Sequence, residues 1–197
     1  MPAPLTQEDL ERYGDVLAQL KARVEHAVAI LENVSVVFDL ESAALQLRKA
    51  IELVALATLT VNRQNLESIT TVLHQKHWDD ARKLIRRVNP DYWPVPFEPF
   101  PDATGRVALE PIEEPFLTEA DAGREYGFLS DLIHAENPFN RRTIDRATVD
   151  RVRGIASGLG RLLGLHTVDL GGRENLIIAQ LEPGTEGGVH VRVLNQV

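Results

Sequence analysis

The chain has 197 residues, of which 44% are hydrophobic and 25% are charged, and it contains no cysteine. This composition is typical of a soluble globular protein, and it excludes disulfides and thiolate metal sites. The net charge of −8 argues against a protein that coats nucleic acid, although residues 98–125 hold most of the excess acid and leave room for a basic face elsewhere. The N-terminus shows no basic segment followed by an apolar one, and the longest apolar run covers residues 51–61. We therefore expect a cytoplasmic protein that does not enter a membrane.

Two long helices are predicted at the start of the chain. Thr6 and Asp9 have the spacing of a capping box, and Asp39 is placed to cap a second helix. Apolar residues then recur at spacings of three and four along both segments. In the first helix these are Leu10, Tyr13, Leu17, Leu20, Val24, Ala27, Leu31 and Val34, and in the second Leu40, Ala44, Leu47, Ile51, Val54, Thr58 and Val61. Two such seams joined by a short connection predict an antiparallel hairpin, and a coiled-coil dimer is an alternative use of the same seams.

A third, shorter helix is predicted over residues 74–88, and it ends at Asn89-Pro90 because proline disfavours a helical residue before it. Residues 91–117 are rich in proline, which predicts a long irregular crossover with room for one short strand at residues 106–109. Five aromatic residues favour docking of this crossover onto the helices. They are Tyr92, Trp93, Phe97, Phe100 and Phe116.

A second capping box at Thr118 and Asp121 opens a helix that reaches His134. Thr143 or Asp145 opens the last helix, in which Gly154 and Gly158 would allow close approach of a neighbour. After Leu165 the pattern changes to alternation with a period of two, which predicts strands at residues 167–170, 175–181 and 189–194.

These elements predict one mainly α (α+β) domain over residues 1–197, in which a long antiparallel helical bundle carries a small C-terminal three-stranded antiparallel β-meander. Residues 1–90 form the hairpin and third helix, 91–117 the crossover, 118–165 two further helices and 166–197 the meander. The two seams, with extra apolar residues beside them, present more apolar surface than one hairpin buries. We therefore also expect a homodimer.

One candidate catalytic site lies where the fourth predicted helix ends. Asp131 precedes His134 by one helical turn, so its carboxylate can orient the imidazole, and Asn137, Arg141 and Arg142 follow shortly after. An imidazole with a nearby arginine can support metal-independent cleavage of a phosphodiester. The structural alternative is that His134 interacts with the helix dipole and caps the last carbonyls.

Two other segments carry candidate binding residues. His74 and His77 are three residues apart and could hold a divalent metal ion with a carboxylate such as Asp79 or Asp80, or they could be surface histidines. The second segment combines cations with aromatic rings and would suit single-stranded RNA, although arginine stems covering rings in a packed crossover would use the same residues. Its residues are Arg82, Arg86, Arg87, Tyr92 and Trp93.

The segments LRKAIELVALATLTVNR, NPDYWPVPF and YGFLSDLIHAENPF resemble a group of uncharacterised prokaryotic proteins. More remotely, LRKAIEL and the arrangement of Tyr126, Leu129, Ser130 and His134 are similar to the HEPN superfamily. That resemblance implies an all-α bundle that often dimerises, with members that are RNase toxins and others that bind nucleotides or proteins without catalysis. Active members carry an arginine, four to six residues and then a histidine, and the literal match here is Arg161 with His166.

Three functional classes follow from these patterns. The first is a non-catalytic binding or assembly protein of HEPN-like type, in a bacterial defence or toxin–antitoxin system as the resemblance implies. The second is a metal-independent RNase of HEPN type, and the third is a metal-dependent enzyme using His74 and His77. The expected partners are a second copy of the chain and either a protein or an RNA, and no cofactor is expected.

Overall fold

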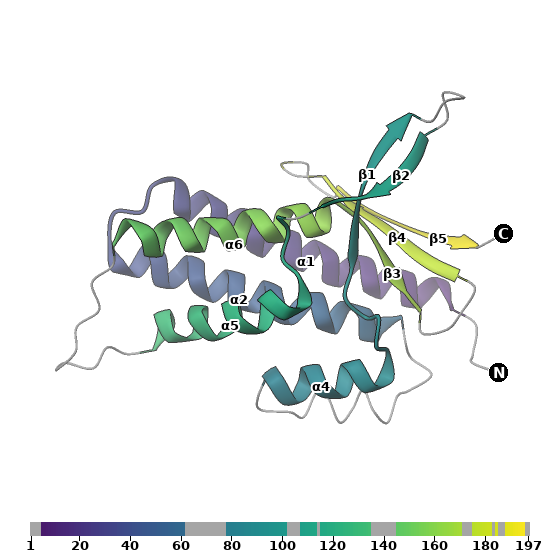
Figure 1. The fold of residues 1–197 in the computed structure, drawn as a ribbon, viewed down its shortest axis with the longest axis horizontal. Coiled ribbons are helices and arrows are strands. Elements are labelled where there is room, and N and C mark those ends of the chain that lie inside the picture. The colour runs from purple at the N-terminus through teal and green to yellow at the C-terminus, as the bar shows by residue number, and fades with distance from the viewer. Residues whose placement is uncertain are drawn as a thin grey trace.

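A computed structural model describes residues 5–61, 78–101, 107–113, 115–134, 145–170, 175–182, 184 and 188–195. Helices and a single sheet account for most of this chain (Figure 1). The helices are α1 (Gln7–Glu32), α2 (Val37–Thr60), α4 (Trp78–Val88), α5 (Glu119–Ile133) and α6 (Arg146–Gly164). The strands are β1 (Val95–Pro101), β2 (Val107–Pro111), β3 (Leu165–Asp169), β4 (Asn175–Leu181) and β5 (Val189–Asn195). The mainly helical α+β class predicted from the sequence is confirmed.

The predicted hairpin of two long helices is present as α1 and α2, which pack along each other (Figure 1). All seven predicted seam positions of α2 are buried, and in α1 the central positions Tyr13, Leu17 and Leu20 are each at most 1% exposed. The periodicity of three and four therefore identified the inward faces correctly, because each seam stays on one side of its helix.

The helix starts follow the capping chemistry with one correction. Thr6 Oγ1 accepts a hydrogen bond from the backbone N–H of Asp9 at 3.2 Å, and the Asp9 carboxylate accepts from the backbone N–H of Thr6 at 3.1 Å. Asp39, predicted to precede its helix, lies inside the first turn of α2. From there its carboxylate accepts backbone N–H groups of Ser35 and Val36 at 2.9 and 3.1 Å. These bonds lower the pKa of Asp39. They also satisfy backbone N–H groups that the start of a helix leaves unpaired.

The sheet is larger than predicted. It has five antiparallel strands in the order β2-β1-β3-β4-β5, so the predicted meander (β3 to β5) is extended by a hairpin from the proline-rich crossover. Only Val95 and Pro96 of β1 pair with β3, and the later prolines Pro99 and Pro101 face β2 beyond that junction. Proline is tolerated there because each residue lies at an edge or near a strand end. The prediction of an irregular crossover was therefore wrong over residues 95–101, whereas the short strand expected at residues 106–109 corresponds to β2 at Val107–Pro111.

The sheet covers one end of the helical bundle, on the side where α1 begins (Figure 1). β5 packs on α1, where Val191 Cγ2 lies near Gly14, and α6 packs against β1, β3 and β4. Residues from both layers, such as Leu162, Val168 and Ile177, are fully buried in one continuous core. On the other side of the bundle α5 packs on α2, and α4 makes a smaller contact with α2.

The two glycines predicted to allow close approach on α6 differ. A Cβ atom on Gly158 would lie 3.3 Å from the backbone nitrogen of Leu117, which donates a hydrogen bond to the Gly158 carbonyl. A Cβ atom on Gly154 would meet nothing within 4 Å. The prediction of close packing therefore holds at Gly158 and not at Gly154.

These two glycines give a paired test of the packing. We expect Gly154→Ala to raise the free energy of unfolding by about 0.5–1 kcal/mol, because alanine is the better helix former and its methyl group has space. The free energy of unfolding of Gly158→Ala should be lower than that of Gly154→Ala by about 1–3 kcal/mol, since its methyl group presses on the Leu117 backbone. Urea unfolding of both variants measures the difference. Equal stabilities would contradict the close contact at Gly158.

Candidate functional site

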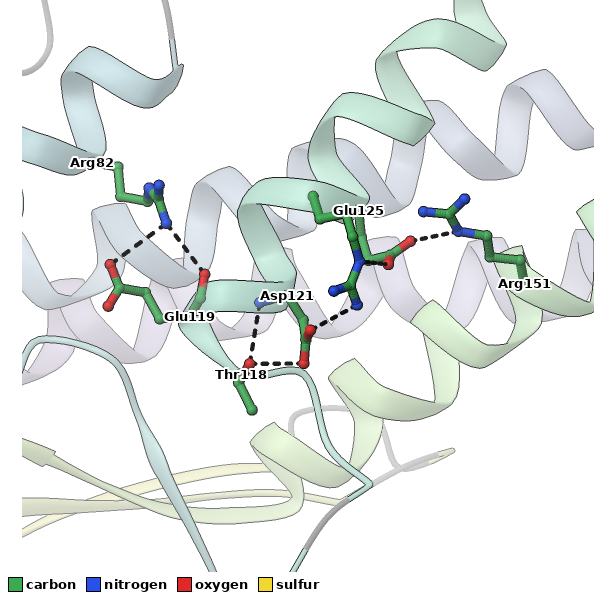
Figure 2. A network of polar contacts seen from close by, with 7 residues as sticks. Arg82, Thr118, Glu119, Asp121, Glu125 and Arg151 are labelled. Atoms are coloured by element: carbon green, nitrogen blue, oxygen red, sulfur yellow. Dashed lines mark hydrogen bonds and ion pairs between the residues drawn. The ribbon is translucent and has the colours of Figure 1, made fainter.

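Glu119, in the first turn of α5, joins α4 to the crossover segment. Figure 2 shows its contact with Arg82 of α4. Its carboxylate accepts a hydrogen bond from the Tyr92 hydroxyl at 2.9 Å and forms ion pairs with Arg86 at 3.1 Å and Arg82 at 3.8 Å. The Arg82 guanidinium also donates to the Glu119 backbone carbonyl at 3.4 Å. Burial, and then the Glu119 charge, raise the pKa of Tyr92. Two cations and one hydroxyl thus compensate a carboxylate that is largely withdrawn from water.

A second network lies six residues further along α5, around the buried Glu125 (Figure 2). Its two carboxylate oxygens accept from Arg124 Nε at 3.0 Å and Arg151 Nε at 2.9 Å, and Arg124 also reaches Asp121 at 2.7 Å. The Arg151 guanidinium lies 3.8 Å from the centre of the Phe128 ring, a cation–π contact. The charged residues of this network border a hollow of about 380 Å³ between α5 and α6. Both oxygens of Glu125 are engaged within the fold, which favours a role in joining the two helices.

The residues of the predicted RNA-binding segment are placed mostly inside this framework. Tyr92 is fully buried, and Trp93 donates its indole N–H to the Leu117 carbonyl at 3.0 Å. Arg82 and Arg86 pair with Glu119, whereas Arg87 is exposed. The ring of Tyr92 offers no open face on which a base could stack, so that part of the hypothesis was wrong. The structure has the alternative arrangement, in which these residues pack the crossover onto the helices.

The two residues of the arginine–histidine match lie in different environments, His166 in the core and Arg161 at the surface. His166, on β3, is fully buried, and its Nδ1 lies 3.2 Å from the Leu163 carbonyl while its Nε2 lies 3.1 Å from the Tyr13 hydroxyl. A carbonyl can only accept, so Nδ1 carries the proton and Nε2 accepts from Tyr13. Desolvation lowers the pKa of His166 from 6.5 to about 4 and raises that of Tyr13. Arg161 is instead 42% exposed, 3.8 Å from Glu98. A sealed, neutral imidazole cannot reach an RNA phosphate.

The predicted catalytic site lies partly outside the described residues. Asp131 and His134 are both exposed at the end of α5. His134 has extended backbone angles (φ −77°, ψ 142°), so it is the residue that terminates the helix and not part of its last turn. Asn137, Arg141 and Arg142 fall outside the described residues, and their convergence on His134 stays a prediction.

The predicted metal ligands His74 and His77 also lie outside the described residues. Within the ranges that the structure describes, no group of three or more His, Cys, Asp or Glu side chains is placed to hold a metal ion. The possible carboxylate partner Asp80 is described, and it pairs with Lys83 at 3.5 Å in α4.

A larger hollow, of about 830 Å³, runs between α1 and α6. We call it the α1–α6 groove. Its walls are mostly apolar or small, and charged side chains stand along both edges. The lining residues on α1 are Val24, Glu25, Val28, Ala29, Leu31 and Glu32, and those on α6 are Arg153, Ala156, Ser157, Gly160 and Arg161. Gly184 completes one end, where its backbone N–H donates to Glu25 at 2.8 Å and lowers the pKa of that carboxyl.

Comparison with known proteins identifies no relative, so the class of this protein is inferred from its own geometry. No protein-family model matches the chain, and no match was found among curated proteins or solved structures. None of the described helices has the length and apolar character needed to cross a membrane. The fold therefore defines the chain as an α+β helical-bundle protein, and an apolar groove lies between two of its helices.

Sequence reasoning missed the groove and both carboxylate centres. Glu119 and Glu125 were read as part of a generally acidic stretch, because their arginine partners on α4 and α6 are 26–37 residues away in the chain. The groove had a usable signal. Ala29, which lies off the seam of α1, and Ser157 and Gly160 on α6 are all small or lack a side chain.

Proposed function

We propose that the protein is a non-catalytic binding or assembly protein of helical-bundle type, and that it acts by associating with a protein surface through the α1–α6 groove. The observation that carries this proposal is the character of the groove. Its volume is about 830 Å³, its walls are mostly apolar, and Val28 in its lining is 42% exposed. An apolar groove bordered by charges is typical of a surface that receives a helix.

The polar groups elsewhere support the same class. His166 is sealed and neutral, Glu125 is held between Arg124 and Arg151, and Glu119 is held between α4 and the crossover. A catalytic site needs an acid, base or nucleophile that faces a substrate. In these three clusters the ionisable groups face one another, so they stabilise the arrangement of the helices.

The HEPN resemblance adds a context and an alternative. It places the proposed assembly protein in a bacterial defence or toxin–antitoxin system, where non-catalytic members of that superfamily bind other proteins or nucleotides. The alternative is the metal-independent RNase, and the observation in its favour is that His134 and Asp131 are exposed at the end of α5, where a substrate has access to them.

An RNA-cleavage assay separates these two functions. We expect labelled single-stranded RNA to stay intact with the purified protein, both with a chelator and with added Mg²⁺ or Zn²⁺, and to give the same result with His134→Ala. Cleavage by the wild type that His134→Ala abolishes, while its unfolding midpoint is unchanged, would establish the RNase instead. Metal-dependent cleavage lost in His74→Ala and His77→Ala would establish the third class. The matched control is His190→Ala, because His190 is also exposed but lies on β5, away from α5.

A further inference from the structure

The edges of the α1–α6 groove carry opposite charges at matching heights. Glu25 and Glu32 stand on the α1 side, whereas Arg153 and Arg161 stand on the α6 side. Arg153 donates to the Leu31 carbonyl at 2.7 Å, which places it level with Glu32. Because the helices run antiparallel, the eight residues from Arg153 to Arg161 correspond to the seven from Glu32 back to Glu25. The α1 wall therefore carries two carboxylates and the α6 wall two guanidinium groups, at the same two levels. Within the chain Glu25 also pairs with Lys21 at 3.1 Å, and Arg161 with Glu98 at 3.8 Å, whereas Glu32 and Arg153 form the level at which the charge test below is made.

The groove is also long, and small residues line it. A continuation of about 230 Å³ shares Val24, Glu25 and Gly160 with it and extends to Leu20 and Leu163. From Leu20 to Glu32 the α1 wall spans roughly 18 Å at about 1.5 Å per residue. A Cβ atom on Gly160 would meet nothing within 4 Å, so the groove is open at that point. A second pair of helices can approach such a surface closely.

We propose that the α1–α6 groove is completed by a second copy of this chain, related by a two-fold axis that runs parallel to the groove. This axis keeps each residue at its height along the groove and exchanges the two walls. The α1 helix of one copy then lies opposite α6 of the other, with Glu32 facing the second copy's Arg153 and Glu25 facing its Arg161. The inference rests on the proposed assembly function and names its partner.

Charge complementarity is the reason for choosing a second copy over another occupant. An unrelated helix would need its own acidic and basic rows in this register, whereas a second copy supplies them by symmetry. Val28 and Ala29 from each α1 would be covered in the same step, which removes the exposed apolar strip from water. Charges that border an interface fix its register and its partner, while the apolar centre supplies affinity.

The first test compares two glycines of α6, of which only Gly160 lines the α1–α6 groove. Gly160 lines the groove, Gly154 borders the hollow beside Glu125, and a Cβ atom on either meets nothing within 4 Å. The wild type should be a dimer by sedimentation and light scattering at micromolar concentration. Gly160→Leu should raise its dissociation constant about tenfold or more by filling the groove, and Gly154→Leu should leave it unchanged. A monomeric wild type, or a dimer that Gly160→Leu leaves intact, would overturn the proposal.

The second test reads the pairing of charges between copies. Glu32→Arg places two arginines opposite each other in every homodimer, and Arg153→Glu places two glutamates there, so each variant alone should be monomeric. Mixing the two variants in equal amounts should restore a dimer, because both contacts then join opposite charges. This rescue excludes misfolding, for instance from the loss of the Arg153 bond to Leu31.

The outcomes of these tests are separate from those of the RNA assay. If mixing fails to restore association, or if the wild type is a dimer that neither charge variant affects, then this face is not the interface, while non-catalytic assembly still stands. RNA cleavage that depends on His134 would instead end the proposed function, whatever the oligomeric state.

Discussion

Tyr92→Ala is expected to lower the free energy of unfolding by about 3–5 kcal/mol, the range for truncating a fully buried aromatic side chain. Its ring lies edge-on to Trp93 with centroids 5.9 Å apart, and its hydroxyl donates to Glu119. Removing the ring opens a cavity where the crossover docks and takes away the hydroxyl that helps to hold Glu119 between Arg82 and Arg86. Urea or thermal unfolding monitored by circular dichroism measures the loss.

The controls separate docking from nucleic-acid binding. Tyr92→Phe keeps the ring and removes only the hydrogen bond, so it should cost about 1 kcal/mol. Arg87→Ala, at an exposed position of α4, should change stability by less than about 0.5 kcal/mol. If the segment were an RNA-stacking platform, Tyr92→Ala would weaken RNA binding while leaving stability unchanged. That result would contradict the packed arrangement of the crossover.

The helical part of the fold could be predicted because its signals are local. The seam of α2 needs one buried face and a period near 3.6, and Thr6, Thr118 and Asp145 each cap a helix through residues three positions away. The β1–β2 hairpin could not be predicted in the same way. Prolines interrupt its alternation, and what keeps it in the sheet is the pairing of Val95 and Pro96 with Thr167 and His166, about seventy residues away.

The candidate sites were predicted less well, for a related reason. A short spacing such as that of Arg161 and His166 does not say which side chain points into the core. His166 contacts Tyr13 in a strand whose three central residues are all buried, while Arg161 on α6 is 42% exposed. Likewise the partners of Glu119 and Glu125 come from helices distant in sequence. A single sequence gives their residue types but not the packing that brings them together.

Acid should weaken the fold through the buried His166 before it affects the carboxylates. In the folded chain the pKa of His166 is lowered from its ordinary 6.5 to about 4, so between these values the unfolded chain binds a proton that the folded chain does not. The stability that neutral His166 provides is therefore complete above pH 6.5 and is lost as pH falls towards 4. At roughly 1.4 kcal/mol per pH unit, the loss over this range is about 3 kcal/mol. Protonation of Asp39 and Asp145, whose pKa values are also lowered, reduces the stability further at still lower pH.

Urea unfolding at several pH values between 7.5 and 4.5 would measure this dependence. His166→Gln should start less stable but show a flatter profile, because glutamine can accept from Tyr13 and does not titrate. His190→Gln is the matched control. His190 is 57% exposed beside Glu182, so its variant should keep the wild-type slope. A wild-type stability that stays constant from pH 7 to pH 5 would mean that His166 is accessible to protons in the folded chain. That accessibility would in turn reopen His166 as a residue that a substrate could reach.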